Sequence, residues 1–182
     1  MNLSYWNISG LDSTTITSGK LEAIATVGNN SFSSAAIHTL SSPLTGEFTI
    51  VADLELETPN SSNSADHLLY IDGTDGYAYV GISYVGTDLN FLADINGSWD
   101  TVIFSANPRP STVKLKIKRD TGNYLSVIIE ESVSGTTLYN LSESSIPFIG
   151  NITAVRLVNY NTGDRFGISA KWDYITVQDR EQ

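Results

Sequence analysis

Hydrophobic and polar residues alternate with a period of two along most of the chain. In one segment Phe48, Ile50 and Leu54 share one face, while Asp53 and Glu55 share the other. Successive side chains of a β-strand point to opposite faces of the sheet, so this alternation is typical of a strand with one buried face. No long stretch has the i, i+3, i+4, i+7 apolar spacing of an amphipathic helix. The pattern therefore predicts an all-β protein.

Turn sequences divide the alternating pattern into short strands. Strands are expected over 20–25, 33–39, 47–57, 66–72, 76–85, 88–94, 99–105, 111–119, 123–131, 136–141, 152–160 and 166–177. Turn residues lie between them, as at 72–76 and at the dipeptide formed by Asn96 and Gly97. Short strands with frequent turns predict an antiparallel β-sandwich of two sheets. The length of 182 residues suits a single domain, 1–182.

The order of these segments resembles the concanavalin A-like lectin/glucanase superfamily, especially its laminin-G-like and carbohydrate-binding jelly rolls. The resemblance is carried by the segments YWNISGLDSTTITSGKLEAIA, GEFTIVADLELE, VKLKIKRDTGN and AVRLVNYNTGDRFGISAKWDYITV, and it covers nearly the whole chain. It implies two curved antiparallel sheets, the concave one of which often forms a glycan groove. Because this superfamily contains lectins, glycosidases, adhesion domains and structural virion modules, the fold alone does not set the function.

A ligand-binding face is expected on neighbouring strands in the middle of the chain. Alternation places Tyr77 and Tyr79 on one face, where we expect them to be open to solvent, and places Asn90 and Asp94 together on the next strand. If the two strands form a hairpin, these four residues make one patch, and Trp99 flanks it. Sugar rings stack on aromatic rings, and their hydroxyls hydrogen-bond to Asp and Asn side chains. The alternative is that the tyrosines are rim residues of the core.

Three carboxylates, Asp53, Glu55 and Glu57, alternate along one strand and are expected to lie next to the tyrosines. The laminarinase-type glycosidases of the superfamily are similar, because they use acidic residues at i, i+2 and i+4 as nucleophile, helper and acid/base. A retaining mechanism needs two carboxyl groups about 5 Å apart, one of them protonated. This chain reads Asp-x-Glu-x-Glu where that family has Glu-x-Asp before its last Glu. We interpret the three as a solvated polar face and keep glycoside hydrolysis as an alternative.

The resemblance also implies a structural Ca²⁺ bound by an acidic residue in the last strand, here Asp173. Because Ca²⁺ takes six to eight oxygen ligands, a second carboxylate such as Glu22 has to assist. No other cofactor is expected. The two histidines, His38 and His67, form no recognisable Ser-His-Asp arrangement, and we expect one to be a strand residue and the other to lie at the surface.

Charge and composition narrow the choice of partners. The chain has 20 Asp and Glu against 10 Lys and Arg, a net charge of −10, and no cysteine. The absence of cysteine excludes disulfides and thiolate sites. The negative charge argues against nucleic acids and anionic membranes. Half of the basic residues fall within 109–119, a cluster too small to reverse this. Neutral glycans are therefore the favoured partners.

The sequence as a whole predicts a non-catalytic, lectin-like module for adhesion or targeting that binds neutral glycans on one sheet face. The alternative is a structural module of a virion, tail or surface assembly, which binds other subunits and has no sugar ligand. The N-terminal residues have neither a basic region nor a hydrophobic stretch, so no signal peptide is expected. We expect the domain to work outside the cell, or on a cell or virion surface, as part of a larger assembly.

Overall fold

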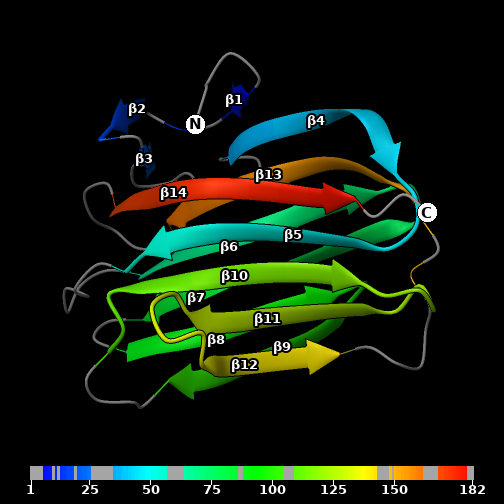
Figure 1. Cartoon of the computed structure of the whole chain (residues 1–182). Coiled ribbons are helices and arrows are strands. Elements are labelled where there is room, and N and C mark those ends of the chain that lie inside the picture. The colour runs from blue at the N-terminus through cyan, green and yellow to red at the C-terminus, as the bar shows by residue number, and fades with distance from the viewer. Residues whose placement is uncertain are drawn as a thin grey trace.

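The fold is built from β-strands that pack as two layers (Figure 1). The computed structural model describes residues 6–9, 11, 13–18, 20–25, 35–56, 64–85, 88–104, 109–142, 148, 150–161 and 168–179. Every regular element in these ranges is a strand, and neighbouring strands pair antiparallel. In the described part of the chain, no helix is long and apolar enough to cross a membrane.

Each layer is a sheet of seven strands. In spatial order, sheet A contains β1 (Asn7–Ser9), β4 (Ala35–Leu44), β13 (Ile152–Asn161), β6 (Ser64–Gly73), β7 (Gly76–Val85), β8 (Asp88–Ile95) and β9 (Ser98–Phe104). Sheet B contains β12 (Thr137–Ser142), β11 (Leu125–Glu131), β10 (Thr112–Arg119), β5 (Phe48–Glu55), β14 (Ile168–Asp179), β3 (Lys20–Ala25) and β2 (Ser13–Thr17). Sheet B lies in front of sheet A in Figure 1.

The predicted antiparallel two-sheet β-sandwich is confirmed, and each of the twelve expected strands is present. Residues 57–63, between β5 and β6, lie outside the described residues. The alternating pattern did not predict β1 or β2, because β1 has three residues and β2 (STTIT) lacks a repeated apolar position. Both are edge strands, so each pairs with a neighbouring strand on one side only.

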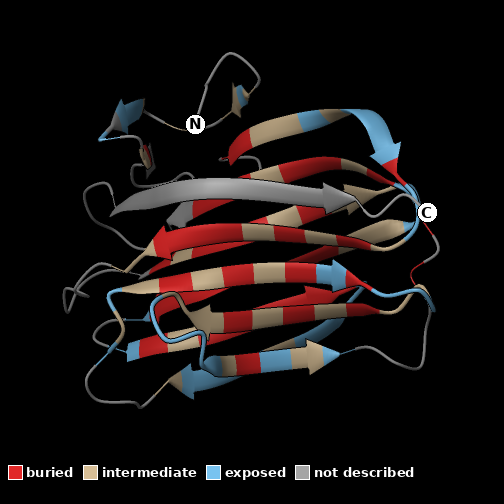
Figure 2. Ribbon diagram, in the orientation of Figure 1, coloured by how far each residue is buried: buried red, intermediate tan, exposed pale blue. Residues whose placement is uncertain are grey.

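The core fills the space between the two sheets, and the alternation of burial along β5, β10 and β11 is visible in Figure 2. From sheet B, Ile50, Leu115 and Ile129 point inward; from sheet A, Val80 and Phe91 meet them. Burial of apolar side chains on both inner faces supplies the main stabilising free energy of a sandwich. The period of two in the sequence therefore corresponds to this single core.

One histidine also points into the core. His67 shares the inner face of β6 with Leu69 and Ile71 and is 1% exposed. Its ring packs edge-on against Tyr84, with ring centroids 5.5 Å apart. The expectation that one of the two histidines lies at the surface is wrong for His67, and His38, in β4, is half-buried beside Trp6. Burial lowers the pKa of His67 to about 4, and Asn159 beside it opposes this shift only in part.

Arg119 closes one end of the sandwich. It is the last residue of β10, is 1% exposed, and its guanidinium lies 4.8 Å from the ring centre of Phe48. Its nitrogens donate to backbone carbonyls of Gly46 (2.6 Å), Gly150 (2.6 Å), Leu44 (3.3 Å) and Phe148 (3.4 Å). The acceptors come from the β4–β5 connection and from the segment before β13. One side chain thus joins segments that are distant in sequence.

Candidate functional site

The predicted ligand-binding residues lie on the face of sheet A that is turned away from sheet B, called here the outer face. Residues directly opposite each other on antiparallel strands share a face. Tyr79 is opposite Tyr70 on β6 and Asp94 on β8, and Asp94 is opposite Trp99 on β9. Tyr77 lies two residues before Tyr79 on β7 and therefore points to the same face. The structure therefore brings Tyr77, Tyr79, Asp94 and Trp99 together, as the alternation predicted.

Three tyrosines form the centre of this face. The rings of Tyr70, Tyr77 and Tyr79 are nearly parallel, with centroids 5.6 to 6.3 Å apart and interplanar angles of 7° to 13°. Tyr79 is only 7% exposed, since it packs with Leu68 and Leu92 in a small apolar cluster. The expectation that Tyr77 and Tyr79 are open to solvent is therefore wrong for Tyr79, and Tyr77 is half-buried. The buried ring of Tyr79 is therefore not accessible to a sugar.

The hydroxyl groups of these tyrosines stay protonated at neutral pH. Burial raises the pKa of Tyr70 to about 12, with a further contribution from Asp72. Burial and the nearby carboxylate of Asp94 also raise the pKa values of Tyr77 and Tyr79. A protonated phenol can both donate and accept a hydrogen bond.

Trp99 supplies the exposed aromatic ring of the site. Its residue is 63% exposed, and it lies at the beginning of β9, the edge strand of sheet A. The turn before it contains Asn96 and Gly97, with φ of 52° and 89°. This is the left-handed conformation that a two-residue hairpin turn requires. The turn holds Trp99 beside Asp94 and keeps its ring in solvent.

The carboxylate of Asp94 is held in a fixed orientation. The backbone N–H of Gly97 donates to Oδ1 at 2.6 Å, and the hydroxyl of Tyr77 donates to Oδ2 at 3.3 Å. The side chain of Asn96 accepts a hydrogen bond from the backbone of Tyr77 at 2.8 Å. Each carboxylate oxygen has a second lone pair, so Asp94 can accept further hydrogen bonds from a ligand.

An ion pair borders the site on its other side. Arg156 of β13 lies opposite Tyr70 and donates to both carboxylate oxygens of Asp72, at 2.5 and 2.7 Å. Its guanidinium lies 5.4 Å from the ring centre of Tyr70. This bidentate geometry fixes the Arg156 side chain and neutralises its charge. The residue Asp94, opposite Trp99, is only 7% exposed, so a ligand can reach its carboxylate only from the side of Trp99 and the turn.

Asn90 shares the outer face but lies four positions before Asp94 on β8, about 13 Å away along the strand. Its neighbours across the sheet are Ser83 on β7 and Ile103 on β9. Asp66 lies opposite Ser83, and burial raises the pKa of its carboxyl group. Asn90 thus belongs to a second polar group, separate from the one around Asp94.

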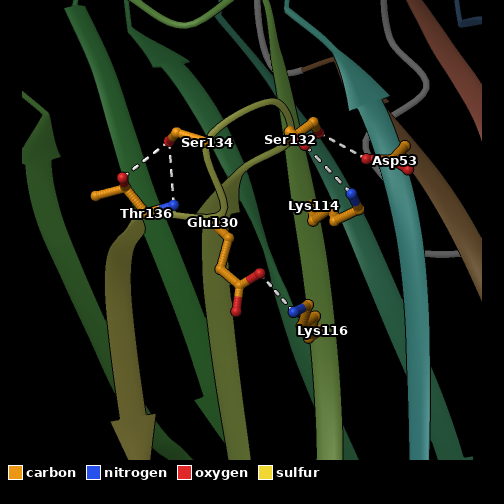
Figure 3. A network of polar contacts seen from close by, with 7 residues as sticks. All are labelled: Asp53, Lys114, Lys116, Glu130, Ser132, Ser134 and Thr136. Atoms are coloured by element: carbon orange, nitrogen blue, oxygen red, sulfur yellow. Dashed lines mark hydrogen bonds and ion pairs between the residues drawn. The ribbon is translucent and has the colours of Figure 1, made fainter.

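The carboxylates of the glycosidase alternative are on the opposite side of the molecule. Asp53 and Glu55 belong to β5 and point outward from sheet B, so the expectation that they lie next to the tyrosines is wrong. The hydroxyl of Ser132 donates to Asp53 at 2.6 Å within the polar network of Figure 3, and Lys20 pairs with Glu55 at 3.0 Å. Glu57 lies outside the described residues. Asp53 is only 7% exposed, so the interpretation as a solvated polar face is wrong for Asp53, and both described carboxylates are engaged in local contacts.

The rest of that network joins β10, β11 and the turn between β11 and β12. Lys116 pairs with Glu130, and Lys114 donates to the backbone carbonyl of Ser132 at 3.3 Å (Figure 3). Ser134 and Thr136 hydrogen-bond to each other in the turn between β11 and β12. The lysines of β10 are therefore part of a local network between strands.

The calcium hypothesis stays a prediction. Asp173 lies in β14, but its side chain is outside the described residues. Glu22 is half-buried on β3 and pairs across the strands with Lys171, two positions before Asp173. Among the described residues, no group of three or more Asp, Glu or His side chains could hold a metal ion. If Asp173 and Glu22 bind calcium, EDTA will lower the melting temperature, and an unchanged Tm would contradict the hypothesis.

Sequence reasoning missed Tyr70, Asp72 and Arg156. A signal for the first two was available, because the turn between β6 and β7 has Thr74 and Asp75 at its tip. Counting back from this two-residue turn places Tyr70 opposite Tyr79 and Asp72 opposite Tyr77. No comparable signal exists for Arg156, because β13 pairs with β6 over a long separation in sequence.

Comparisons with known proteins agree on the fold. No model of a known protein family matches the chain, and no curated protein matches its sequence. Several solved structures are similar. An alginate lyase from Pseudomonas aeruginosa has a TM-score of 0.67 and 15% identity, over 99% of this chain and all of that one. The CBM2 module of the evolved Dit of Lactobacillus casei BL23 phage J-1 has a TM-score of 0.66 and 14% identity, over 91% of this chain and 78% of that one.

A legume lectin-like domain from Entamoeba histolytica has a TM-score of 0.65 and 9% identity, over 98% of this chain and 92% of that one. At such identities the similarity concerns the fold alone. The resemblance predicted from the sequence is confirmed at this level. The chain has the jelly-roll fold of the concanavalin A-like lectins and glucanases.

Proposed function

We propose that this protein is a non-catalytic carbohydrate-binding module whose ligand site is the outer face of sheet A around Trp99 and Asp94. The observation that carries the proposal is the pairing of an exposed indole ring with an oriented carboxylate on adjacent strands. A sugar ring can place its C–H face on Trp99 and its hydroxyls on Asp94. The hydroxyls of Tyr70 and Tyr77 offer further hydrogen bonds beside them.

A neutral glycan suits this face best. The protein carries a net charge of −10, and Asp94 would repel an acidic sugar. Arg156, which could attract such a sugar, is already held by Asp72. The fold supports the same class of ligand by analogy, because carbohydrate-binding modules and lectin-like domains share it. We extend the proposal to a module that works outside the cell or on a cell or virion surface.

Replacing Trp99 with alanine is expected to weaken glycan binding at least about tenfold, because the stacking surface is removed. A panel of neutral oligosaccharides is titrated by calorimetry, and in the wild type the fluorescence of the exposed indole should shift on binding. Trp99→Phe should retain part of the affinity. Asp94→Asn should lose most of it, because an amide nitrogen cannot accept the hydrogen bonds that a carboxylate oxygen accepts.

Val133→Ala is the control, since Val133 is an exposed apolar residue in the β11–β12 turn of the other sheet. If no neutral glycan gives a binding signal by calorimetry or fluorescence, the proposal is wrong. Self-association, or docking to a particle, without any sugar response would favour the structural-module alternative. Hydrolysis of β-glucan or galactan by the wild type, lost in Asp53→Asn, would favour the glycosidase alternative.

A further inference from the structure

The exposed residues of the outer face form a line along β9. Trp99, Thr101 and Ile103 alternate on this face, all three are exposed, and Ile103 is 72% exposed. The strands behind them are much less accessible, since Leu68, Leu92 and Tyr79 are buried. A ligand that contacts this face therefore reaches β9 along its length more easily than it reaches the centre of the sheet.

Each end of the line pairs an exposed apolar side chain with a polar one on β8. Trp99 lies opposite Asp94, and Ile103 lies opposite Asn90. The amide oxygen of Asn90 is shielded and has no hydrogen-bond partner among the described residues. Because that oxygen is buried, a ligand hydroxyl can pair with it only after the half-buried Asn90 side chain turns outward, and this pairing would recover the cost of the unmade hydrogen bond. The two ends are about 13 Å apart along the strands.

From this arrangement we infer that the protein binds a linear, neutral oligosaccharide that runs along β9, with one subsite at Trp99 and Asp94 and a second at Ile103 and Asn90. A single sugar ring is shorter than the distance between the two ends, so one ring fills one subsite and a chain fills both. Thr101, between them, is small enough to let the chain pass. This inference rests on the proposed function and adds the shape of the ligand.

Binding of cello-, laminari-, manno- and galacto-oligosaccharides, from the monosaccharide to the hexasaccharide, tests the inference by calorimetry. Affinity is expected to rise with chain length until both subsites are filled. The double variant Asn90→Ala, Ile103→Ser is expected to weaken binding of the hexasaccharide about tenfold and to leave monosaccharide binding unchanged. Trp99→Ala should weaken both.

Val102→Ser is the matched control, because Val102 is 45% exposed on the same strand but points to the opposite face. It should leave binding at all chain lengths unchanged. Equal affinity for the monosaccharide and the hexasaccharide, or equal loss of both in the double variant, would overturn the second subsite and leave the proposed function standing. Failure of every oligosaccharide to bind the wild type would overturn both.

Discussion

Replacing Arg119 with methionine is expected to lower the free energy of unfolding by about 3 to 5 kcal/mol, the cost of leaving several buried carbonyls without a donor. Methionine fills part of the same buried volume but donates no hydrogen bonds. The four backbone carbonyls that Arg119 contacts would then lose a charged donor inside the protein. A buried acceptor without a partner costs about 1 to 3 kcal/mol, so the loss of several at once is severe.

Urea unfolding measures this effect, with a lower midpoint at an unchanged slope as the expected result. Lys118→Met, at the exposed neighbouring position of β10, is the control and should stay within about 0.5 kcal/mol of the wild type. Arg119→Lys should also be destabilised, because one ammonium group cannot serve carbonyls spread around a planar guanidinium. A midpoint for Arg119→Met equal to that of Lys118→Met would show that Arg119 does not stabilise the fold.

The period of two in the sequence also determines which polar residues are buried. The alternation that points Val113, Leu115 and Ile117 inward also points Arg119 inward. It likewise places His67 on the core face of β6. Polarity favours the surface for both residues, while their register favours the core, and register prevailed. It did so because a shift by one residue would expose every apolar side chain of the strand.

The candidate site was predictable where short hairpins fix the register. The turns after β6 and β8 set the pairing of Tyr79 with Tyr70 and of Asp94 with Trp99, so the face of each residue followed from the sequence. Exposure did not follow, because it depends on neighbours from distant strands. Tyr79 is buried since Tyr70 and Leu68 pack around it. Trp99 is exposed since β9 is an edge strand, which only the order of strands in the sheet reveals.

Lowering the pH from about 7 to about 4 is expected to remove about 3 kcal/mol of stability through His67 alone. Burial holds the pKa of folded His67 at about 4, against 6.5 for an unperturbed histidine. Between these values the unfolded chain binds a proton that the folded protein does not. Lowering the pH therefore stabilises the unfolded state relative to the folded state. The contribution to stability is therefore full at neutral pH and is lost as the pH falls from about 6.5 to about 4.

Asp66, next to His67 in sequence, acts in the opposite direction. Burial raises the pKa of its carboxyl group in the folded protein, so the folded state takes up that proton first and gains stability as the pH falls. The effect of His67 is isolated by comparing the wild type with His67→Gln, in which Asp66 is retained. Urea unfolding at a series of pH values should show that the stability of the wild type relative to His67→Gln falls by about 3 kcal/mol between pH 7 and pH 4. His38→Gln controls for the loss of a histidine elsewhere, and a difference for His67→Gln that stays constant with pH would mean that the pKa of His67 is the same in the folded and unfolded states.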